Sequence, residues 1–228
     1  MENQEQIAVF FEEMMKRDKA DKVERYRRLN KFVRSGQILF VGSSLMEQFP
    51  VNELLMDLQL PYTVYNRGIG GFTTTELMEV LDVCVYELNP AHVFINIGTN
   101  DLNGPEYSLS GLMERYEAIL TAIKEHLPEV KLHLLAYYPM SEKAAAQNPM
   151  MADILQYRNN VRVSEANDAV KALAEKMGAE FLNCNGGITD DEGNMKPEYT
   201  IEGMHMYGDG YYHVLQSLLP TLKKIAEG

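Results

Sequence analysis

Short apolar runs alternate with longer segments of helical spacing along most of this 228-residue chain. The strand-like runs are residues 37–41, 62–65, 92–97, 131–137 and 180–182. The helical patterns are residues 74–88, 109–127, 154–177 and 210–226. A continuously apolar run too short for a helix fits a strand that is buried on both faces of a parallel sheet. The alternation therefore predicts an α/β fold in three layers, a five-stranded parallel sheet with helices on both faces.

The first 35 residues lie outside this alternation. Apolar residues recur at helical spacing between residues 4 and 32, with charged residues between them. We predict one or two helices there, forming an N-terminal helical extension (residues 1–35) packed on a single domain that spans residues 1–228. A dimerisation arm is the alternative, and it would make the protein a homodimer. Farther along, Thr73 and Glu76 have the spacing of a capping box, which predicts a helix that begins at this point.

The charge balance excludes several classes of partner. The chain has 33 acidic and 21 basic residues, a net charge of −12, and this field repels nucleic acid and anionic membrane surfaces. The N-terminus is polar and acidic where a secretion signal would be basic and then apolar, and no apolar run approaches membrane-spanning length. We expect no nucleic-acid partner, no stable membrane association and a cytoplasmic location. Cys84 and Cys184 lack metal-ligand spacing and are expected to be reduced and buried.

Polar and glycine-rich residues follow the first two expected strands, where ligands of parallel sheets bind. Ser44 stands in the turn at residues 42–45 (GSSL), where its hydroxyl can project into the crevice, although small residues there also cap helices. The glycines of residues 66–73 (NRGIGGFT) can present backbone N–H groups to a phosphate or to an oxyanion. A dinucleotide site would need a third glycine at Thr73, so it is disfavoured, and a structural turn stays an alternative.

Two further segments carry candidate groups. Asn100, in residues 98–101 (GTND) after the third strand, can donate its amide to an oxyanion, or it can serve only the turn. Near the C-terminus Glu202 and His205 stand three residues apart, close enough on one turn for the carboxylate to fix the tautomer of the ring. A solvent-exposed histidine without a role is the alternative for this pair.

Taken together and in this order, the four segments resemble the four sequence blocks of the SGNH hydrolases, also called GDSL esterases and lipases. Residues 42–45 are similar to the G-D-S-L block, residues 66–71 to the glycine block and residues 202–205 to the D-x-x-H block, and residues 98–101 are identical to the G-T-N-D form. The resemblance runs from about residue 37 to the C-terminus. It implies the flavodoxin-like fold of that family and an esterase that needs neither a metal nor an organic cofactor.

The resemblance also implies a role for each matched residue. Ser44 would attack the acyl carbon of an ester, with His205 as general base and Glu202 as the acid that orients the imidazole. The oxyanion hole would consist of the backbone N–H groups of Ser44 and Gly71 together with the side chain of Asn100. This set comprises every catalytic residue that we predict.

The chain departs from the family pattern at two positions. Ser43 stands where the family has the aspartate of its G-D-S-L block, which puts in doubt any hydrogen-bond network that this aspartate anchors. Glu202 stands where the family has the triad aspartate and is one methylene longer. These departures motivate the competing hypothesis of a non-catalytic binding protein of the same fold. A nucleotide-binding α/β protein is a third possibility, and the missing glycine at Thr73 argues against it.

The blocks leave the substrate open. We expect a small acylated substrate, most simply an acetyl ester of a sugar or of another small alcohol, because the sequence shows neither a secretion signal nor an evident lipid-binding apolar segment. A lysophospholipase or thioesterase that acts on longer acyl chains is the alternative. Residues 137–151 are expected to form either a wall of the pocket or a surface connection. Arg67 is expected either to recognise an anionic substrate group or to be solvated or salt-bridged.

Overall fold

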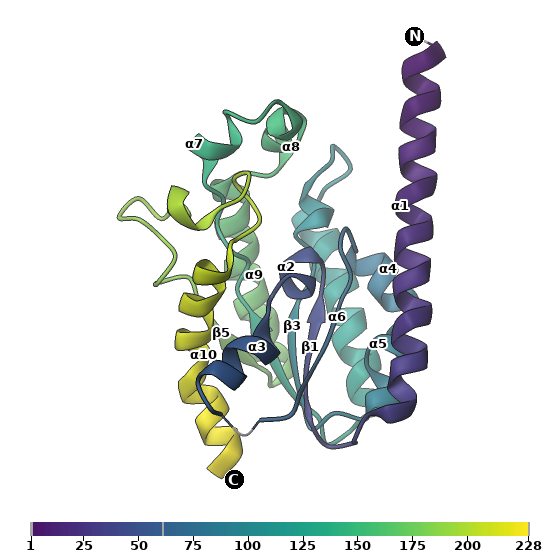
Figure 1. Cartoon of the computed structure of the whole chain (residues 1–228), viewed down its shortest axis with the longest axis vertical. Helices are drawn as coiled ribbons and strands as arrows, with labels where there is room; N and C mark the ends of the chain where they lie inside the picture. Colours follow the sequence, from purple (N-terminus) through teal and green to yellow (C-terminus); the bar gives the residue numbers. More distant parts are fainter. Residues whose placement is uncertain (1, 61, 228) are drawn as a thin grey trace.

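The fold is built on a parallel sheet of five strands (Figure 1). The computed structural model describes residues 2–60 and 62–227. The strands are β1 (Ile38–Gly42), β2 (Val64–Gly68), β3 (His92–Asn96), β4 (Lys131–Leu135) and β5 (Glu180–Leu182). They lie in the order β2-β1-β3-β4-β5, and every neighbouring pair is parallel. This order is that of flavodoxin-like folds, so the predicted fold class is confirmed.

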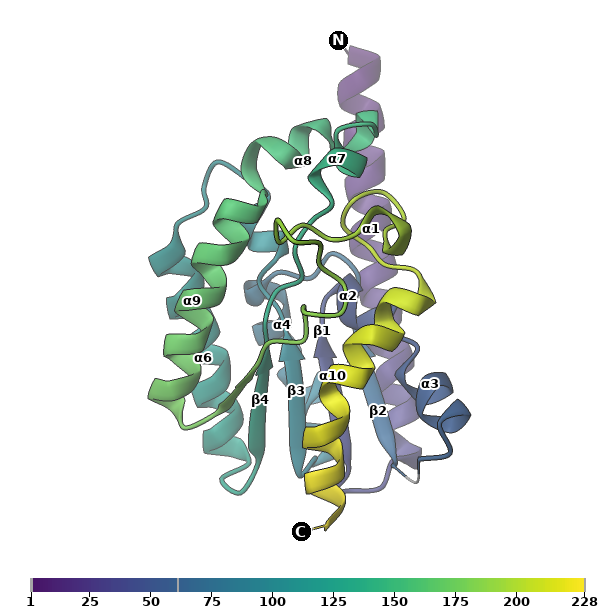
Figure 2. The ribbon, with the colours of Figure 1, turned by 90° about the vertical axis from the view of Figure 1, so that its left-hand side faces the viewer.

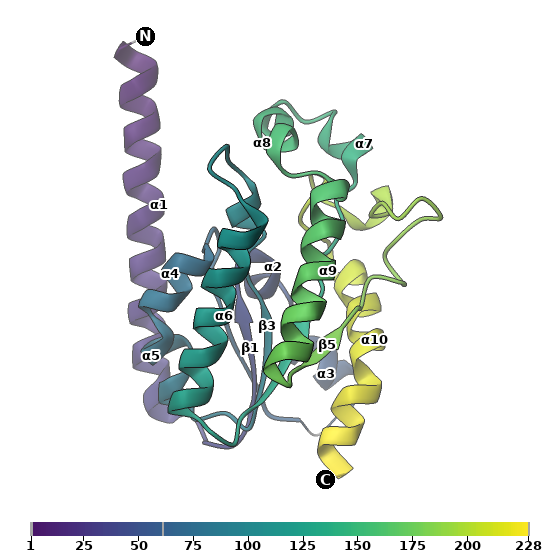
Figure 3. The same cartoon turned by 180° about the vertical axis from the view of Figure 1, so that it is seen from behind.

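Helices cover both faces of the sheet. The helices are α1 (Glu2–Leu29), α2 (Ser44–Glu47), α3 (Val51–Asp57), α4 (Thr74–Glu79), α5 (Leu81–Cys84), α6 (Leu109–His126), α7 (Glu142–Ala145), α8 (Ala152–Tyr157), α9 (Asn160–Met177) and α10 (Gly208–Glu227). Figure 2 shows α10 in front of the strands and α1 behind them, and Figure 3 shows α6 over the opposite face. None of the described helices is both long and apolar enough to cross a membrane.

The strands are apolar on both sides because each face meets its own helical layer. In β1, Leu39 and Val41 pack into a core cluster with residues of α4, α5, α6 and α9. Phe40 points the other way, into a second cluster with residues of α2, α3 and α10, where its ring stacks on Phe94 of β3 at 4.8 Å between centroids. The period of two along a strand thus places alternate side chains in two separate cores.

Helix boundaries differ from the predicted ones where local chemistry interrupts a pattern. The expected helix 74–88 begins as predicted, because Thr73 and Glu76 form a complete capping box. It breaks at Val80, whose φ of −127° is not helical, in a stretch where β-branched valines lose rotamer freedom in a helix. The expected helix 154–177 is two helices, because the Asn159 side chain accepts the N–H of Arg162 and starts α9 anew.

Strand β2 also differs from its predicted position. It runs from Val64 to Gly68 instead of over residues 62–65, so Asn66 and Gly68 belong to the strand and not to the loop after it. The register with β1 begins at Val64, where Thr63 contributes only its carbonyl to the N–H of Ile38 at 3.4 Å, and it ends where Gly68 pairs with Gly42 at the carboxyl end of β1. The loop that follows this strand therefore begins at Ile69.

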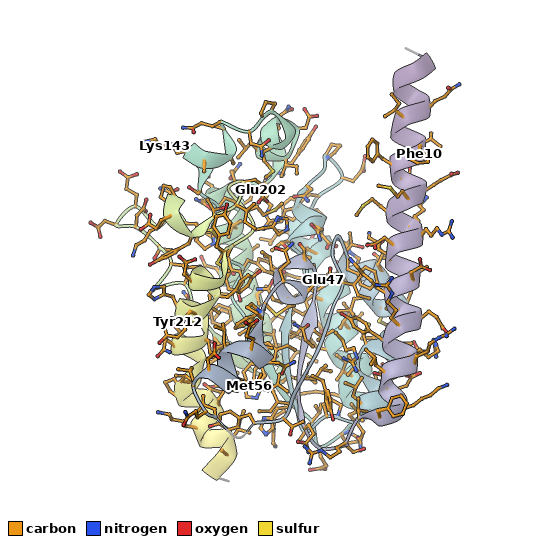
Figure 4. All side chains as sticks on the ribbon, viewed as in Figure 1. Phe10, Glu47, Met56, Lys143, Glu202 and Tyr212 are labelled. Atoms are coloured by element: carbon orange, nitrogen blue, oxygen red, sulfur yellow. The ribbon has the colours of Figure 1, made fainter. Side chains whose placement is uncertain are left out.

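The N-terminal segment is one continuous helix, α1. Its second half lies against the body of the protein, where Val23 and Tyr26 pack on the first core cluster. Its first half stands clear of the body (Figure 1) and exposes Ile7, Phe10, Phe11, Met14 and Met15, with Phe10 63% exposed (Figure 4). The sequence alone shows no evident lipid-binding apolar segment and does not predict the exposure of these apolar side chains. The dimerisation arm stays a prediction.

Both cysteines are buried and free, as predicted. Burial raises the pKa of Cys84 and of Cys184 to about 12 in each case. The two thiols therefore stay protonated near neutral pH, which leaves them without nucleophilic character.

A chain of polar side chains crosses β3, β4 and β5 near the amino ends of these strands. His92 Nδ1 lies 2.9 Å from His133 Nε2, and His133 Nδ1 lies 2.7 Å from Glu180 Oε2. His133 also stacks on Phe94 at 4.3 Å between ring centroids. Burial lowers the pKa of His133, and the opposing effect of the Glu180 carboxylate does not overcome it.

This burial makes the stability of the fold sensitive to acid. Unfolded histidine takes up a proton near about pH 6.5, whereas folded His133 resists protonation, so the free energy of unfolding falls as the pH drops below that value. We expect the melting temperature of the wild type to fall more between about pH 7 and about pH 5 than that of His133→Gln. Thermal melts at the two pH values measure this difference, and His126→Gln controls for the loss of an exposed histidine. Equal pH dependence in wild type and His133→Gln would contradict the expectation.

Candidate active site

Ser44 stands at the turn between β1 and α2. A Cβ on the preceding Gly42 would lie 2.0 Å from the backbone oxygen of Asn96 in β3, so only glycine lets the chain leave the sheet there. The Ser43 carbonyl then accepts the N–H groups of Met46 and Glu47, which closes the first turn of α2. Ser44 is thereby fixed at the start of a short helix, outside the carboxyl end of β1.

His205 and Glu202, the latter labelled in Figure 4, lie on the loop that leads into α10, next to Gly203, which packs on α7. The His205 Nε2 atom lies 2.9 Å from Ser44 Oγ, although 161 positions separate the two residues in the sequence. On its other side His205 Nδ1 lies 2.5 Å from Glu202 Oε1. The same carboxylate oxygen accepts the backbone N–H of His205 at 3.2 Å. Hydroxyl, imidazole and carboxylate thus form one continuous hydrogen-bonded chain.

The extra methylene of Glu202 is accommodated by a tightly held loop. The Thr200 hydroxyl donates to the carbonyl of His205 at 2.9 Å and accepts the N–H of Gly203 at 2.8 Å. Gly203 has a φ of +108°, and a Cβ there would lie 2.5 Å from the Cβ of Ala145 in α7. The loop therefore packs directly on α7, and glycine is required at the contact.

The surroundings of Glu202 favour the ionised form of its carboxylate. Partial burial raises the pKa of Glu202, but the hydrogen bonds and the charge of His205 outweigh this effect, so that the net pKa lies below its usual range. An ionised carboxylate on Nδ1 holds the proton of the imidazole on that nitrogen and leaves Nε2 free to accept the proton of Ser44.

The predicted oxyanion donors lie at the starts of α2 and of the 3-10 helix η3 (Asn100–Leu102) and in the loop after β2, all outside the carboxyl ends of neighbouring strands. Within the described residues the backbone N–H groups of Ser44 and Gly71 donate to no other protein group. The Asn100 amide donates one N–H to the Phe72 carbonyl at 2.9 Å, which keeps its second N–H available and ties Asn100 to the segment that follows Gly71. A Cβ on Gly70 would lie 3.8 Å from Ser44 Cβ, so the glycine loop lies beside Ser44.

Asp101, the neighbour of Asn100, has a structural role. Its carboxylate accepts the backbone N–H of Thr74 at 3.0 Å and the Thr74 hydroxyl at 2.5 Å, and it pairs with Arg115 at 3.2 Å. These bonds join the start of α4 to α6 directly behind the oxyanion loop. Asp101 thus anchors the turn that carries Asn100.

Arg67 and Ser43 lie outside the catalytic chain. Arg67 is buried, with its guanidinium 4.8 Å from the centroid of the Tyr26 ring and 3.0 Å from Asn30 Oδ1 at Nε. Both expectations for Arg67, recognition of an anionic group and a solvated or salt-bridged position, are wrong, because burial under α1 removes it from solvent. Ser43 is buried as well, and its hydroxyl has no hydrogen-bond partner among the described residues.

Arg158, which sequence reasoning missed, lies beneath the catalytic loop. Its side chain is only 1% exposed, and Nη1 lies 2.6 Å from the sulfur of Met204. Burial lowers the pKa of Arg158 to about 10, against the opposing charge of Glu202. The residue stands inside an ordinary helical pattern, so no signal in the sequence marks it as a neighbour of the triad.

Part of the segment at residues 137–151 forms a small apolar cluster against this loop, and its two predicted roles, a wall of the pocket or a surface connection, stay predictions. Met140, Ala145 and Met151 form a separate cluster against which Met204 packs. A cavity of about 840 Å³ lies farther away, between α9, β5 and residues 183–193, and no triad residue lines it. The chemistry of the hydrogen-bonded chain, and not the size of this cavity, locates the candidate active site.

Known proteins are similar to this chain in sequence and in fold. The model of the GDSL-like lipase/acylhydrolase family matches residues 41–212, which include all four sequence blocks. Human platelet-activating factor acetylhydrolase IB subunit alpha2 is 25% identical over 191 residues, covering 83% of this chain and 77% of its own length. A structure from Streptococcus pneumoniae, described as that of a candidate platelet activating factor, is 30% identical with a TM-score of 0.85, covering 95% of this chain and 98% of its own.

A third similarity concerns the fold alone. A GDSL-like lipase from Bacteroides thetaiotaomicron VPI-5482 is 21% identical with a TM-score of 0.72, and the match covers 90% of this chain and 98% of that chain. The overall fold is therefore shared with this structure.

The position of Glu202 yields a prediction about its contribution to kcat. We expect Glu202→Gln to lower kcat for an ester substrate by about 10³–10⁴-fold, because the amide can no longer fix the imidazole tautomer or balance its positive charge. Steady-state kinetics measures the loss, with Glu198→Gln, an exposed glutamate before the same loop, as control. Turnover close to that of the wild type would show that Glu202 is not a member of the triad and that another acceptor orients His205.

Proposed function

Because the chain belongs to the GDSL-like lipase/acylhydrolase family, it is a hydrolase of ester bonds, and we propose that it cleaves short acyl esters through an acyl-enzyme on Ser44. The observation that carries this proposal is the continuous chain from Ser44 Oγ through His205 to Glu202, with contacts of 2.9 and 2.5 Å. The proposed substrate is an acetyl ester of a sugar or of another small alcohol.

The proposed reaction has two steps, formation of the acyl-enzyme and its hydrolysis. His205 Nε2 takes the proton of Ser44 as Oγ bonds to the acyl carbon, and the carbonyl π electrons move to oxygen. The tetrahedral intermediate then collapses, the ester C–O bond breaks, and His205 gives its proton to the leaving alcohol. A water molecule then attacks the acyl carbon of the acyl-enzyme while His205 takes its proton. The bond between the acyl carbon and Ser44 Oγ breaks, His205 returns a proton to Oγ, and the carboxylic acid leaves.

Two groups of residues stabilise the charges that develop. The negative oxygen of the intermediate is held by the N–H groups of Ser44 and Gly71 and by the amide of Asn100, which are in place before charge appears. The positive imidazolium of His205 is balanced by Glu202, whose lowered pKa keeps the carboxylate ionised.

The proposal of a short acyl group is supported by the relatives. The curated relatives are named acetylhydrolases, and an acetyl group is the smallest acyl group beyond formyl. The alternative is hydrolysis of longer acyl esters, as in a lysophospholipase or thioesterase. The exposed apolar residues of α1, Phe10 among them, favour that alternative because they offer a surface to an alkyl chain.

The two substrate classes differ in their dependence on acyl length. We expect kcat/KM on p-nitrophenyl esters to be highest for acetate and to fall by about tenfold or more for octanoate. A long acyl chain does not fit a site that is shaped for acetyl, and this raises the free energy of the transition state. A panel of acetylated sugars then tests the alcohol component. Activity that rises steadily with acyl length would support the longer-chain alternative and overturn the short-chain proposal.

Adjacent serines provide a matched test of the nucleophile. We expect a fluorophosphonate probe to label the wild type and Ser43→Ala in equal stoichiometry and to leave Ser44→Ala unlabelled, because only Ser44 contacts the imidazole. Ser43→Ala removes a buried hydroxyl without a hydrogen-bond partner and is expected to retain turnover. Mass spectrometry of the labelled peptide reads out the site. A wild type that does not react would favour a non-catalytic binding protein of the same fold.

A further inference from the structure

Helix α1 holds the loop that carries the oxyanion donor Gly71. The ammonium group of Lys19 donates to the Gly71 carbonyl at 2.9 Å and pairs with Glu76 Oε1 at 2.6 Å. The Lys19 side chain is only 19% exposed. A charged hydrogen bond to a backbone carbonyl is stronger than a neutral one, and partial burial strengthens it further. Lys19 therefore fixes the orientation of the peptide that follows Gly71.

A second contact from α1 fixes the residue before Gly71. Lys22 pairs with Glu47 Oε1 at 2.8 Å, and the other carboxylate oxygen of Glu47 accepts the N–H of Gly70 at 2.5 Å. Glu47 belongs to α2, the helix that Ser44 begins (Figure 4). The Gly70–Gly71 peptide, whose N–H is the proposed donor, is thus held at both of its ends.

A third contact continues the pattern along the same face of the helix. The Tyr26 hydroxyl donates to the Gly68 carbonyl at 2.7 Å, and its ring covers the guanidinium of Arg67 at 4.8 Å. Burial raises the pKa of Tyr26 to about 12, so its hydroxyl keeps the proton that it donates. Lys19, Lys22 and Tyr26 are spaced three and four residues apart, which places them on one side of α1.

The glycine loop needs such external support. Gly71 has a φ of +75°, and glycine populates positive and negative φ about equally, so the local sequence does not select this conformation. A donor contributes to catalysis only when it is aimed at the oxyanion before charge develops. The contacts from α1 supply the constraint that the glycines lack.

We propose that Lys19 and Lys22 of α1 are positioning residues of the oxyanion hole, which hold the Gly71 N–H in its catalytic orientation. The inference rests on the proposed acyl-enzyme function, and it adds a role for residues that lie outside the matched range of the family, 41–212. Neither lysine touches the substrate. Each acts through the backbone of the glycine loop, Lys19 directly and Lys22 through Glu47.

The chain offers a matched control for this role. Arg27 also joins α1 to the body, through Asp82 at 3.1 Å and Glu87 at 3.0 Å, and among the described residues its hydrogen bonds and ion pairs do not include the glycine loop. Lys19→Met, Lys22→Met and Arg27→Met each remove one cation and keep most of the apolar stem. All three variants weaken the docking of α1, whereas only the lysine variants release the glycine loop.

We expect Lys19→Met and Lys22→Met to lower kcat by about 10- to 100-fold with KM within about twofold of the wild type, because a misaimed donor weakens only the transition state. Inhibition by a trifluoromethyl ketone, which forms an oxyanion on Ser44, should weaken in parallel. Arg27→Met should keep kcat and inhibitor affinity within about twofold. Thermal melts of all three variants show whether each is folded at the assay temperature.

Each possible result of these assays either supports or contradicts the positioning role of Lys19 and Lys22. Equal losses of kcat in Arg27→Met and Lys19→Met would reduce the effect to general docking of α1 and overturn the proposal, as would an unchanged kcat in both lysine variants. A wild type without turnover and without fluorophosphonate labelling would instead overturn the proposed function on which the inference rests. A Lys19→Met protein that has lost kcat but has kept KM, beside an active Arg27→Met, would support it.

Discussion

The hydrogen bond between Ser44 and His205 is the contact on which the proposed function depends, because it joins the turn after the first strand of the sheet to the last loop before α10. The sheet order makes this contact possible. Strands β1 and β3 lie side by side with β2 on the other edge of β1, so the loops after β1, β2 and β3 open at the same end. The loop before α10 then brings the imidazole to that end, and the crevice forms where parallel sheets of this order bind ligands.

Much of this arrangement could be predicted from the sequence. Apolar runs identify strands by length and composition, and the placement of Ser44, Asn100 and His205 follows from four ordered motifs that resemble one family. Boundaries were harder to predict, because they depend on single side chains. Asn159 restarts a helix that the apolar pattern runs through, and β2 extends to Gly68 because its partner strand continues that far.

The contacts that support the site could not be predicted from one sequence, for a physical reason. Lys19 and Arg158 are cations in helical patterns, and such residues are usually solvated. Their positions beside the glycine loop and the catalytic loop arise only after the chain has folded, when α1 lies beside the oxyanion loop and the end of α8 lies beneath Met204. A periodic pattern shows which face of a helix is polar, but it does not show which backbone that face will meet.

The close packing of Gly203 on Ala145 also bears on how substrate reaches the serine. Helix α7 and the loop that carries His205 have no room between them, and Ser141 N–H donates to the Gly203 carbonyl at 2.8 Å, so an outward swing of this region would take the imidazole with it. Opening on that side would separate base from nucleophile and switch the enzyme off. An ester can therefore reach Ser44 productively only by routes that leave α7 in contact with the His205 loop.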